Sequence, residues 1–132
     1  MSEFSVTVIK SWPEKLNVVD RVAFSTFTNG EKLGDENVIM DVRACAMLHV
    51  FNPDAKNPEY DVIAFLTECG IYYTGSETVQ KQAFNIIDTV VEEEPETKIF
   101  TLRTNTRESI KNKGRRYLTI MLLDTMTAAE TH

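Results

Sequence analysis

One amphipathic helix between stretches of β-type sequence constrains the fold of this chain more than any other feature. In the segment Tyr72–Glu94, apolar residues recur at three- and four-residue spacing, so one apolar face runs along about four helical turns. Thr74 and Glu77 have the spacing of a capping box and predict the start of the helix. Pro95 disfavours helical geometry at Glu94 and predicts the end. The apolar positions are Val79, Ala83, Phe84, Ile86, Ile87, Val90 and Val91.

The sequence on both sides of this helix predicts strands. Apolar residues alternate with polar ones over short runs, and turn-forming clusters such as Asn52–Pro58 separate the runs. We therefore predict a mostly β protein of the α+β class with one main helix. Three strands, the helix and two strands give the element order of a five-stranded OB-like barrel, with the helix between strands 3 and 4. A helix packed on an open antiparallel sheet has the same order and is the alternative. The predicted strands are Val38–Phe51, Tyr60–Leu66, Ile71–Tyr73, Thr97–Thr104 and Arg115–Leu123.

The length of 132 residues predicts a single domain over residues 1–132. Within it we expect a loosely organised N-terminal segment at 1–37, a core at 38–124 and a frayed tail at 125–132. Part of the N-terminal segment, Asn17–Phe27, fits both a helical and a strand pattern. No apolar run approaches the ~18 residues of a membrane span, and the first residues lack the pattern of a signal peptide. These features predict an intracellular protein.

Basic residues are concentrated in one segment of an otherwise acidic chain. The formal net charge is −6, yet the segment Arg103–Arg116 carries +5 and the rest of the chain −11. Such segregation is expected of an anion-binding surface on an acidic protein. The alternative is a solvated loop that happens to be basic. The bases of this segment are Arg103, Arg107, Lys111, Lys113, Arg115 and Arg116.

The residues that usually carry catalysis are sparse in this sequence. His49 stands on a predicted strand face, where a structural imidazole is the more common role, and the other histidine is the last residue. Cys45 and Cys69 lie far apart in apolar runs and are expected to be reduced thiols, without a disulfide or a metal. No nucleophile elbow, phosphate loop or zinc-ligand spacing is present. We therefore predict no enzymatic activity, no cofactor and no metal site.

Aromatic residues flank the basic segment, as expected of a protein that binds single-stranded nucleic acid. In such sites every kind of base can stack on an aromatic side chain, and the cationic side chains lie along the phosphate backbone. Tyr117, together with Thr119 and Met121, is predicted to face outward from the last strand, with Leu118, Ile120 and Leu122 inward. The alternative role for each tyrosine is half-buried packing. The predicted nucleic-acid-binding residues are Arg43, Tyr73, Arg103, Arg107, Lys111, Lys113, Arg115, Arg116 and Tyr117.

Three short motifs resemble those of small single-stranded DNA-binding proteins of bacteriophages and prophages. One is YTGSE at Tyr73–Glu77, which opens the helix, and another is NPEY at Asn57–Tyr60, followed by Val62 and Ile63. The third is KGRRYLT at Lys113–Thr119 in the last strand. The resemblance covers about residues 40–123.

This resemblance implies a non-catalytic protein that binds single-stranded DNA during replication or recombination, in the cytoplasm of a host bacterial cell. The absence of a long apolar run predicts no membrane partner, and both homo-oligomerisation and a protein partner in replication or recombination stay open. Two other functions remain as alternatives. One is a phage or prophage interaction protein that mimics nucleic acid and inhibits a host or defence enzyme, and the other is a phage structural subunit. A mimic should lack a coherent basic segment, which this chain has.

Overall fold

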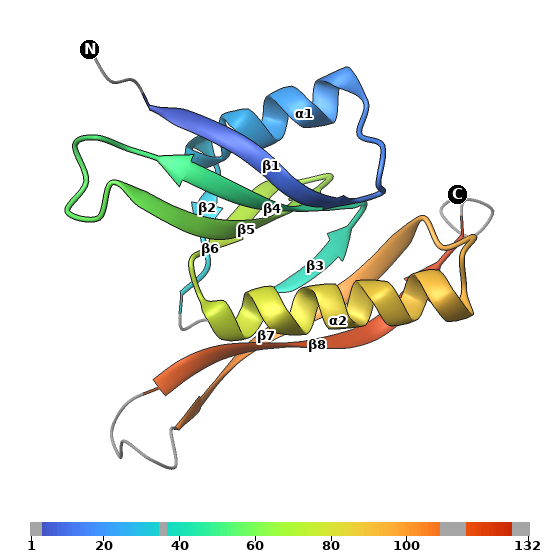
Figure 1. Ribbon diagram of the computed structural model, residues 1–132. Coiled ribbons are helices and arrows are strands. Elements are labelled where there is room, and N and C mark those ends of the chain that lie inside the picture. Colours follow the sequence, from blue (N-terminus) through green and yellow to red (C-terminus); the bar gives the residue numbers. More distant parts are fainter. Residues whose placement is uncertain (1–3, 35–36, 109–115, 128–132) are drawn as a thin grey trace. The chain divides into compact units, whose positions relative to one another are not determined.

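The strands and helices of this protein fall into two compact units (Figure 1). The computed structural model describes residues 4–34, 37–108 and 116–127. The predicted class is confirmed, because the chain is mostly β, with two α-helices and two sheets. Neither α-helix in these ranges is long and apolar enough to cross a membrane. The single domain over 1–132 stays a prediction. Unit 1 consists of Met1–Lys32 and Ala44–Gly75, and unit 2 of Leu33–Arg43 and Ser76–His132.

Unit 1 is built on a five-stranded sheet in the order β1-β4-β5-β6-β2. The predicted turn at Asn52–Pro58 joins β4 to β5, and the backbone N–H of Asn52 donates to the carbonyl of Pro58 over 2.6 Å. The tight turn between β5 and β6 places Gly70 at a φ of 129°, a conformation that favours glycine. The elements are β1 (Ser5–Trp12), α1 (Val18–Ser25), the 3-10 helix η1 (Phe27–Asn29), β2 (Glu31–Lys32), β4 (Ala44–Phe51), β5 (Glu59–Thr67) and β6 (Gly70–Thr74).

Residues 5–32, within the segment 1–37 that is predicted to be loosely organised, form β1, α1, η1 and β2 of unit 1, so the prediction is wrong for this part. Strand β1 pairs with β4 along its length. The ambiguous stretch is helical, since Asn17 caps α1 by accepting a hydrogen bond from the N–H of Asp20 over 2.8 Å. Phe24 and Phe27 are 0% and 1% exposed and pack on one face of the sheet. The sheet residues of this cluster are Ala44, Ala46, Leu48, Val50, Val62, Ala64 and Leu66.

Unit 2 contains a three-stranded antiparallel sheet, in the order β3-β7-β8, and the long helix α2. Figure 1 shows α2 lying along β8, and these two elements are in contact. The frayed tail predicted at 125–132 is wrong for residues 125 and 126, because β8 continues to Met126, and 128–132 lie outside the described residues. The elements are β3 (Ile39–Val42), α2 (Glu77–Glu93), β7 (Ile99–Glu108) and β8 (Arg116–Met126).

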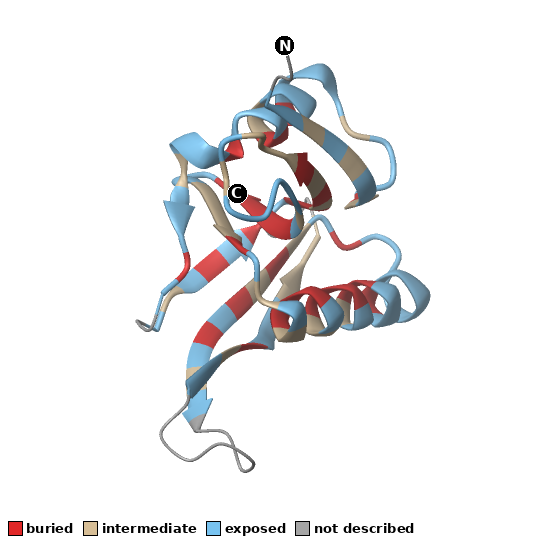
Figure 2. Cartoon of the chain, turned by 60° about the vertical axis from the view of Figure 1, so that its left-hand side comes forward, coloured by how far each residue is buried: buried red, intermediate tan, exposed pale blue. Residues whose placement is uncertain are grey.

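Helix α2 buries five of the seven apolar positions that its sequence predicts, whereas Ile86 is half-buried and Val91 is 47% exposed. Val79, Ala83, Phe84, Ile87 and Val90 are all buried, and Figure 2 shows the buried residues gathered on one side of the helix. The end at Glu93, with Glu94 as C-cap, is also confirmed. The N-cap differs from the prediction.

Ser76, rather than Thr74, caps the N-terminus of α2. The Ser76 hydroxyl accepts from the N–H of Val79 over 3.3 Å. Thr74 is the last residue of β6, where it pairs with Ile63 of β5. Thr74 is therefore part of a strand, although its spacing from Glu77 predicts a helix cap.

The long strand predicted at Val38–Phe51 is two strands that pair in different sheets. β3 pairs with β7 in the sheet of unit 2, β4 pairs with β1 and β5 in the sheet of unit 1, and Arg43 lies between them. Among the described residues the strands form two sheets, and no closed barrel is found. The OB-like barrel is therefore not confirmed.

Strand β7 is longer than predicted, and this extension shapes the candidate site. The sequence predicts a strand that ends at Thr104, followed by a basic linker. In the structure β7 continues to Glu108, and Arg107 pairs with Tyr117 of β8. A register shift between Thr101 and Leu102 leaves Leu123 without a partner in this ladder.

The predicted alternation along β8 is correct at some positions and wrong at others. Tyr117 and Met121 are exposed and Ile120 is buried, as predicted. Thr119, predicted outward, is only 9% exposed, and Leu122, predicted inward, is 38% exposed. The shift at Leu123 lies beside Leu122, which explains why strict alternation fails there.

Candidate nucleic-acid interface

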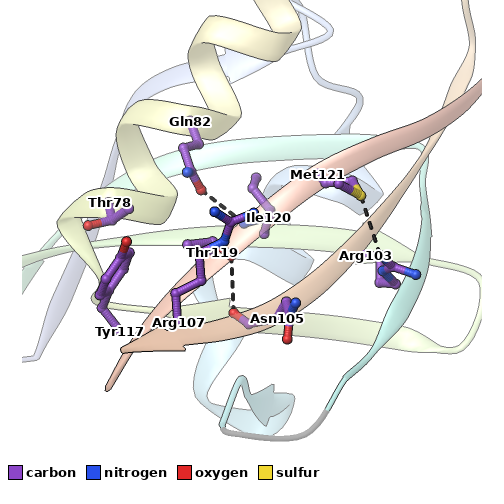
Figure 3. Close-up of a pocket in the computed structure, with 9 residues that line it drawn as sticks. All are labelled: Thr78, Gln82, Arg103, Asn105, Arg107, Tyr117, Thr119, Ile120 and Met121. Atoms are coloured by element: carbon purple, nitrogen blue, oxygen red, sulfur yellow. Dashed lines mark hydrogen bonds between the residues drawn. The ribbon is translucent and has the colours of Figure 1, made fainter. Parts of the chain in front are cut away.

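A groove in unit 2 collects three of the residues that the sequence predicts to bind nucleic acid. It is lined by one face of β7 and β8 and by the first turns of α2, and its volume is about 380 Å³ (Figure 3). Arg103, Arg107 and Tyr117 all lie in it. The remaining lining residues are Thr78, Gln82, Asn105, Thr119, Ile120 and Met121.

Strand register explains why these side chains share one face. Residues directly opposite each other in an antiparallel pair point to the same side of the sheet, and so do residues two apart along a strand. The opposed pairs are Arg103 with Met121, Asn105 with Thr119, and Arg107 with Tyr117. A cationic side chain and an aromatic ring therefore stand side by side at one end of the ladder.

The arginines of the groove keep their charge available. Arg107 is exposed, and its guanidinium forms no hydrogen bond or ion pair with any described residue. Within the same described ranges, the one hydrogen bond of the Arg103 guanidinium is the one that it donates to the Met121 sulfur, at 3.5 Å. In this part of the chain no carboxylate of a described residue lines the groove. On this face, two acidic residues, Asp41 and Asp124, pair with Thr101. The Asp41 carboxylate accepts a hydrogen bond from the Thr101 hydroxyl over 2.7 Å.

Helix α2 forms one side of the groove, through Thr78 and Gln82. The Gln82 Oε1 atom accepts a hydrogen bond from the backbone N–H of Ile120 over 2.9 Å, and Figure 3 shows this bond at the back of the groove. Because β8 is the last strand of its sheet, this N–H faces away from β7 and needs another acceptor. The bond holds α2 against the edge of β8.

Two other predicted residues of unit 2 do not line the groove. Arg116 alternates with Tyr117 and lies on the opposite face of β8, where its guanidinium donates to the Thr106 hydroxyl at 2.8 and 3.2 Å. Arg43 is exposed between β3 and β4. Three further predicted residues, Lys111, Lys113 and Arg115, lie outside the described residues.

Tyr73 belongs to unit 1 and has a packing role there. Its side chain is half-buried against the core of the sheet, with its ring edge-on to Phe27 at a centroid distance of 4.9 Å. Such T-shaped pairs stabilise a core. A nucleic-acid contact by Tyr73 stays a prediction.

Sequence reasoning missed the polar groove residues Thr78, Gln82 and Asn105. Thr78 and Gln82 are one helical turn apart, beside the apolar stripe of α2, and this spacing is the only signal that the sequence contains for them. Asn105 falls in a stretch predicted as linker. Only the pairing of β7 with β8 brings it into the groove.

His49 is held between two carboxylates in unit 1. Its Nδ1 atom lies 2.7 Å from Asp61 Oδ1 and its Nε2 atom 3.5 Å from Glu59 Oε1. The hydrogen bond to Asp61 is the main cause that raises the pKa of His49 above its ordinary value of 6.5. Partial desolvation opposes this effect, and Glu59 adds to it. The arrangement stabilises the imidazolium form on a strand face.

The His49 contacts predict a pH-dependent contribution to stability. Because its pKa is raised on folding, the contribution is fully present below pH 6.5, the ordinary value, and is lost as the pH rises through the folded-state pKa. We expect wild type to exceed His49→Gln in urea midpoint most at acidic pH, with the difference shrinking toward alkaline pH. His132 is common to both proteins and cancels in the comparison. A difference that does not change with pH would contradict the ion-pair geometry.

The cysteines and the remaining titratable groups do not point to a metal or redox site. Among the described residues, no group of three or more His, Cys, Asp or Glu side chains could hold a metal ion. Cys45 is buried, and burial raises the pKa of its thiol well above the ordinary value, so the thiol is protonated. Cys69 is exposed and free.

No protein-family model, curated protein or solved structure matches this chain.

Proposed function

We propose that this chain is a non-catalytic single-stranded DNA-binding protein and that the groove between β7, β8 and α2 is part of its binding surface. The observation that carries the proposal is the pairing of Arg107 with Tyr117 in a groove that no carboxylate of the described residues lines. A guanidinium binds a phosphate, an adjacent ring stacks on a base, and single strands are commonly bound by this combination. The motif resemblance to phage and prophage single-stranded DNA-binding proteins supports the same function, in replication or recombination in the cytoplasm of a bacterial host.

The strand pairings support an OB-type arrangement as the underlying fold. Counting β3 and β4 together as the first strand, it pairs with the second (β5) and the fourth (β7). The second strand pairs with the third (β6), and the fourth with the fifth (β8). OB folds are partly open five-stranded barrels, and their connection between the fourth and fifth strands binds oligonucleotides. In this chain that connection contains Lys111 and Lys113.

The proposal predicts a salt-dependent affinity that the groove arginines control. For single strands, the logarithm of the binding constant falls with the logarithm of salt concentration by about 0.7 for each phosphate neutralised. In fluorescence titrations with oligo-dT, we expect the slope of Arg103→Gln/Arg107→Gln to be shallower than that of wild type. The difference should be about 0.7 for each phosphate that the variant no longer neutralises.

A matched double variant controls for the change in net charge. Lys15 and Lys81 are exposed and lie outside the groove, so Lys15→Gln/Lys81→Gln should keep the wild-type slope. If the arginine variant still binds with an unchanged slope, the phosphate contacts are elsewhere. If wild type does not bind oligo-dT at low salt, the proposed function is wrong, and nucleic-acid mimicry or a phage structural role becomes the better explanation.

A further inference from the structure

In two carboxamide side chains of the groove, the oxygen atom accepts a hydrogen bond from the backbone, while the amino group can still donate to a ligand. The Gln82 Oε1 atom accepts from the backbone N–H of Ile120 over 2.9 Å. The Asn105 Oδ1 atom accepts from the backbone N–H of Thr106 over 2.8 Å. A backbone N–H can only donate, so each bond determines which carboxamide atom is the oxygen. Neither amino group has a hydrogen-bond partner among the described residues.

The groove therefore presents many donors and few acceptors to a ligand. Donors come from α2 through Gln82 and from the sheet through Asn105 and Arg107. The side-chain acceptors that remain are hydroxyl oxygens, which are also donors, the second lone pair of each carboxamide oxygen and the weakly accepting Met121 sulfur. The Thr119 hydroxyl already donates to the backbone carbonyl of Asn105 over 3.3 Å.

This donor set distinguishes bases by the groups on their edges. At pyrimidine C4 and purine C6, thymine and guanine present a carbonyl oxygen, whereas cytosine and adenine present an exocyclic amino group. A carboxamide normally binds adenine with its oxygen and its amino group together. In Gln82 and Asn105 the oxygen already accepts one backbone hydrogen bond, which fixes its direction and leaves it a single lone pair, whereas the amino group is available. An amino group of the base would face these donors.

We propose that this groove is a nucleobase subsite that prefers bases with a carbonyl at pyrimidine C4 or purine C6, with Tyr117 stacking on the base and the Gln82 amino group donating to that carbonyl oxygen. The proposal rests on the proposed function, since it assumes that single-stranded DNA enters the groove. It adds a base preference, which binding to phosphates and ring faces alone does not provide.

Oligo-deoxyuridine and oligo-deoxycytidine of equal length test the preference directly. Their rings have the same size, and they differ in presenting a carbonyl or an amino group at the same position. In fluorescence titrations in mildly alkaline buffer, we expect wild type to bind the deoxyuridine strand about two- to tenfold more tightly, the range of one net hydrogen bond. Equal affinities for the two strands would overturn the base preference while leaving single-strand binding intact. Failure to bind either strand would overturn the proposed function and the preference with it.

Gln82→Glu is the sharpest variant, because it keeps an oxygen for the Ile120 N–H and replaces the free donor with an acceptor. Its added charge weakens binding to both strands, so the readout is the ratio of the two affinities. We expect this ratio to fall to about one or to invert, and an unchanged ratio would overturn the proposal. Asn85→Asp adds the same charge at an exposed position of α2 outside the groove and should keep the wild-type ratio. If Gln82→Glu does not fold, the proposal requires Asn105→Asp to lower the ratio, and an unchanged ratio there overturns it.

Discussion

Replacing Phe24 by alanine is expected to lower the free energy of unfolding by about 3–5 kcal/mol, the range for a fully buried phenylalanine. Phe24 is 0% exposed and lies in the cluster formed with Phe27 and the alanine-lined face of β4 and β5. The small residues Ala44 and Ala46 leave room for the ring, so its removal opens a cavity that the sheet cannot easily fill. Typical domains are stable by only about 5–15 kcal/mol, so the effect should be plain in urea unfolding.

Val19→Ala on the same helix is the matched control. Val19 is 72% exposed, and its replacement should change stability by less than about 0.5 kcal/mol. If Phe24→Ala were as mild as this control, α1 would not be part of the core. The prediction that residues 1–37 are loosely organised would then be restored.

The sequence predicts those elements whose signals are local. The apolar face of α2 is an example, because helical periodicity depends only on neighbouring residues, and five of its seven predicted positions are buried. Boundaries set by partners distant in sequence were missed. Thr74 has the spacing of a helix cap but is held by Ile63 in a strand pair, and Arg107 resembles a linker residue but is held opposite Tyr117.

The candidate site was predicted in part for the same reason. Charge and aromatic content indicate Arg103, Arg107 and Tyr117, and strand register brings them to one face. Charge also indicates Arg116, but this residue lies on the opposite face of β8, because successive side chains of a strand point to opposite sides. Gln82 could not be predicted, because its role depends on which side of α2 meets the edge of β8.

Replacing Tyr117 by alanine is expected to reduce the affinity for oligo-dT roughly tenfold to a hundredfold, because a stacked base contributes about 1–3 kcal/mol. The ring is 40% exposed, lines the groove and stands beside Arg107. Tyr117→Phe keeps the stacking face and should bind almost as wild type does. Because the residue is exposed, neither change should shift the melting temperature by much.

Melting temperature and affinity together separate stacking from packing at this residue. A packing tyrosine would behave in the opposite way, with Tyr117→Ala lowering the melting temperature while the folded fraction binds normally. Phe4→Ala is a suitable control, since Phe4 is an aromatic residue of similar exposure, 44%, in unit 1 and outside the groove. It should leave the affinity unchanged. If Phe4→Ala weakens binding as much as Tyr117→Ala does, exposed aromatic surface in general, rather than the ring beside Arg107, contributes the affinity.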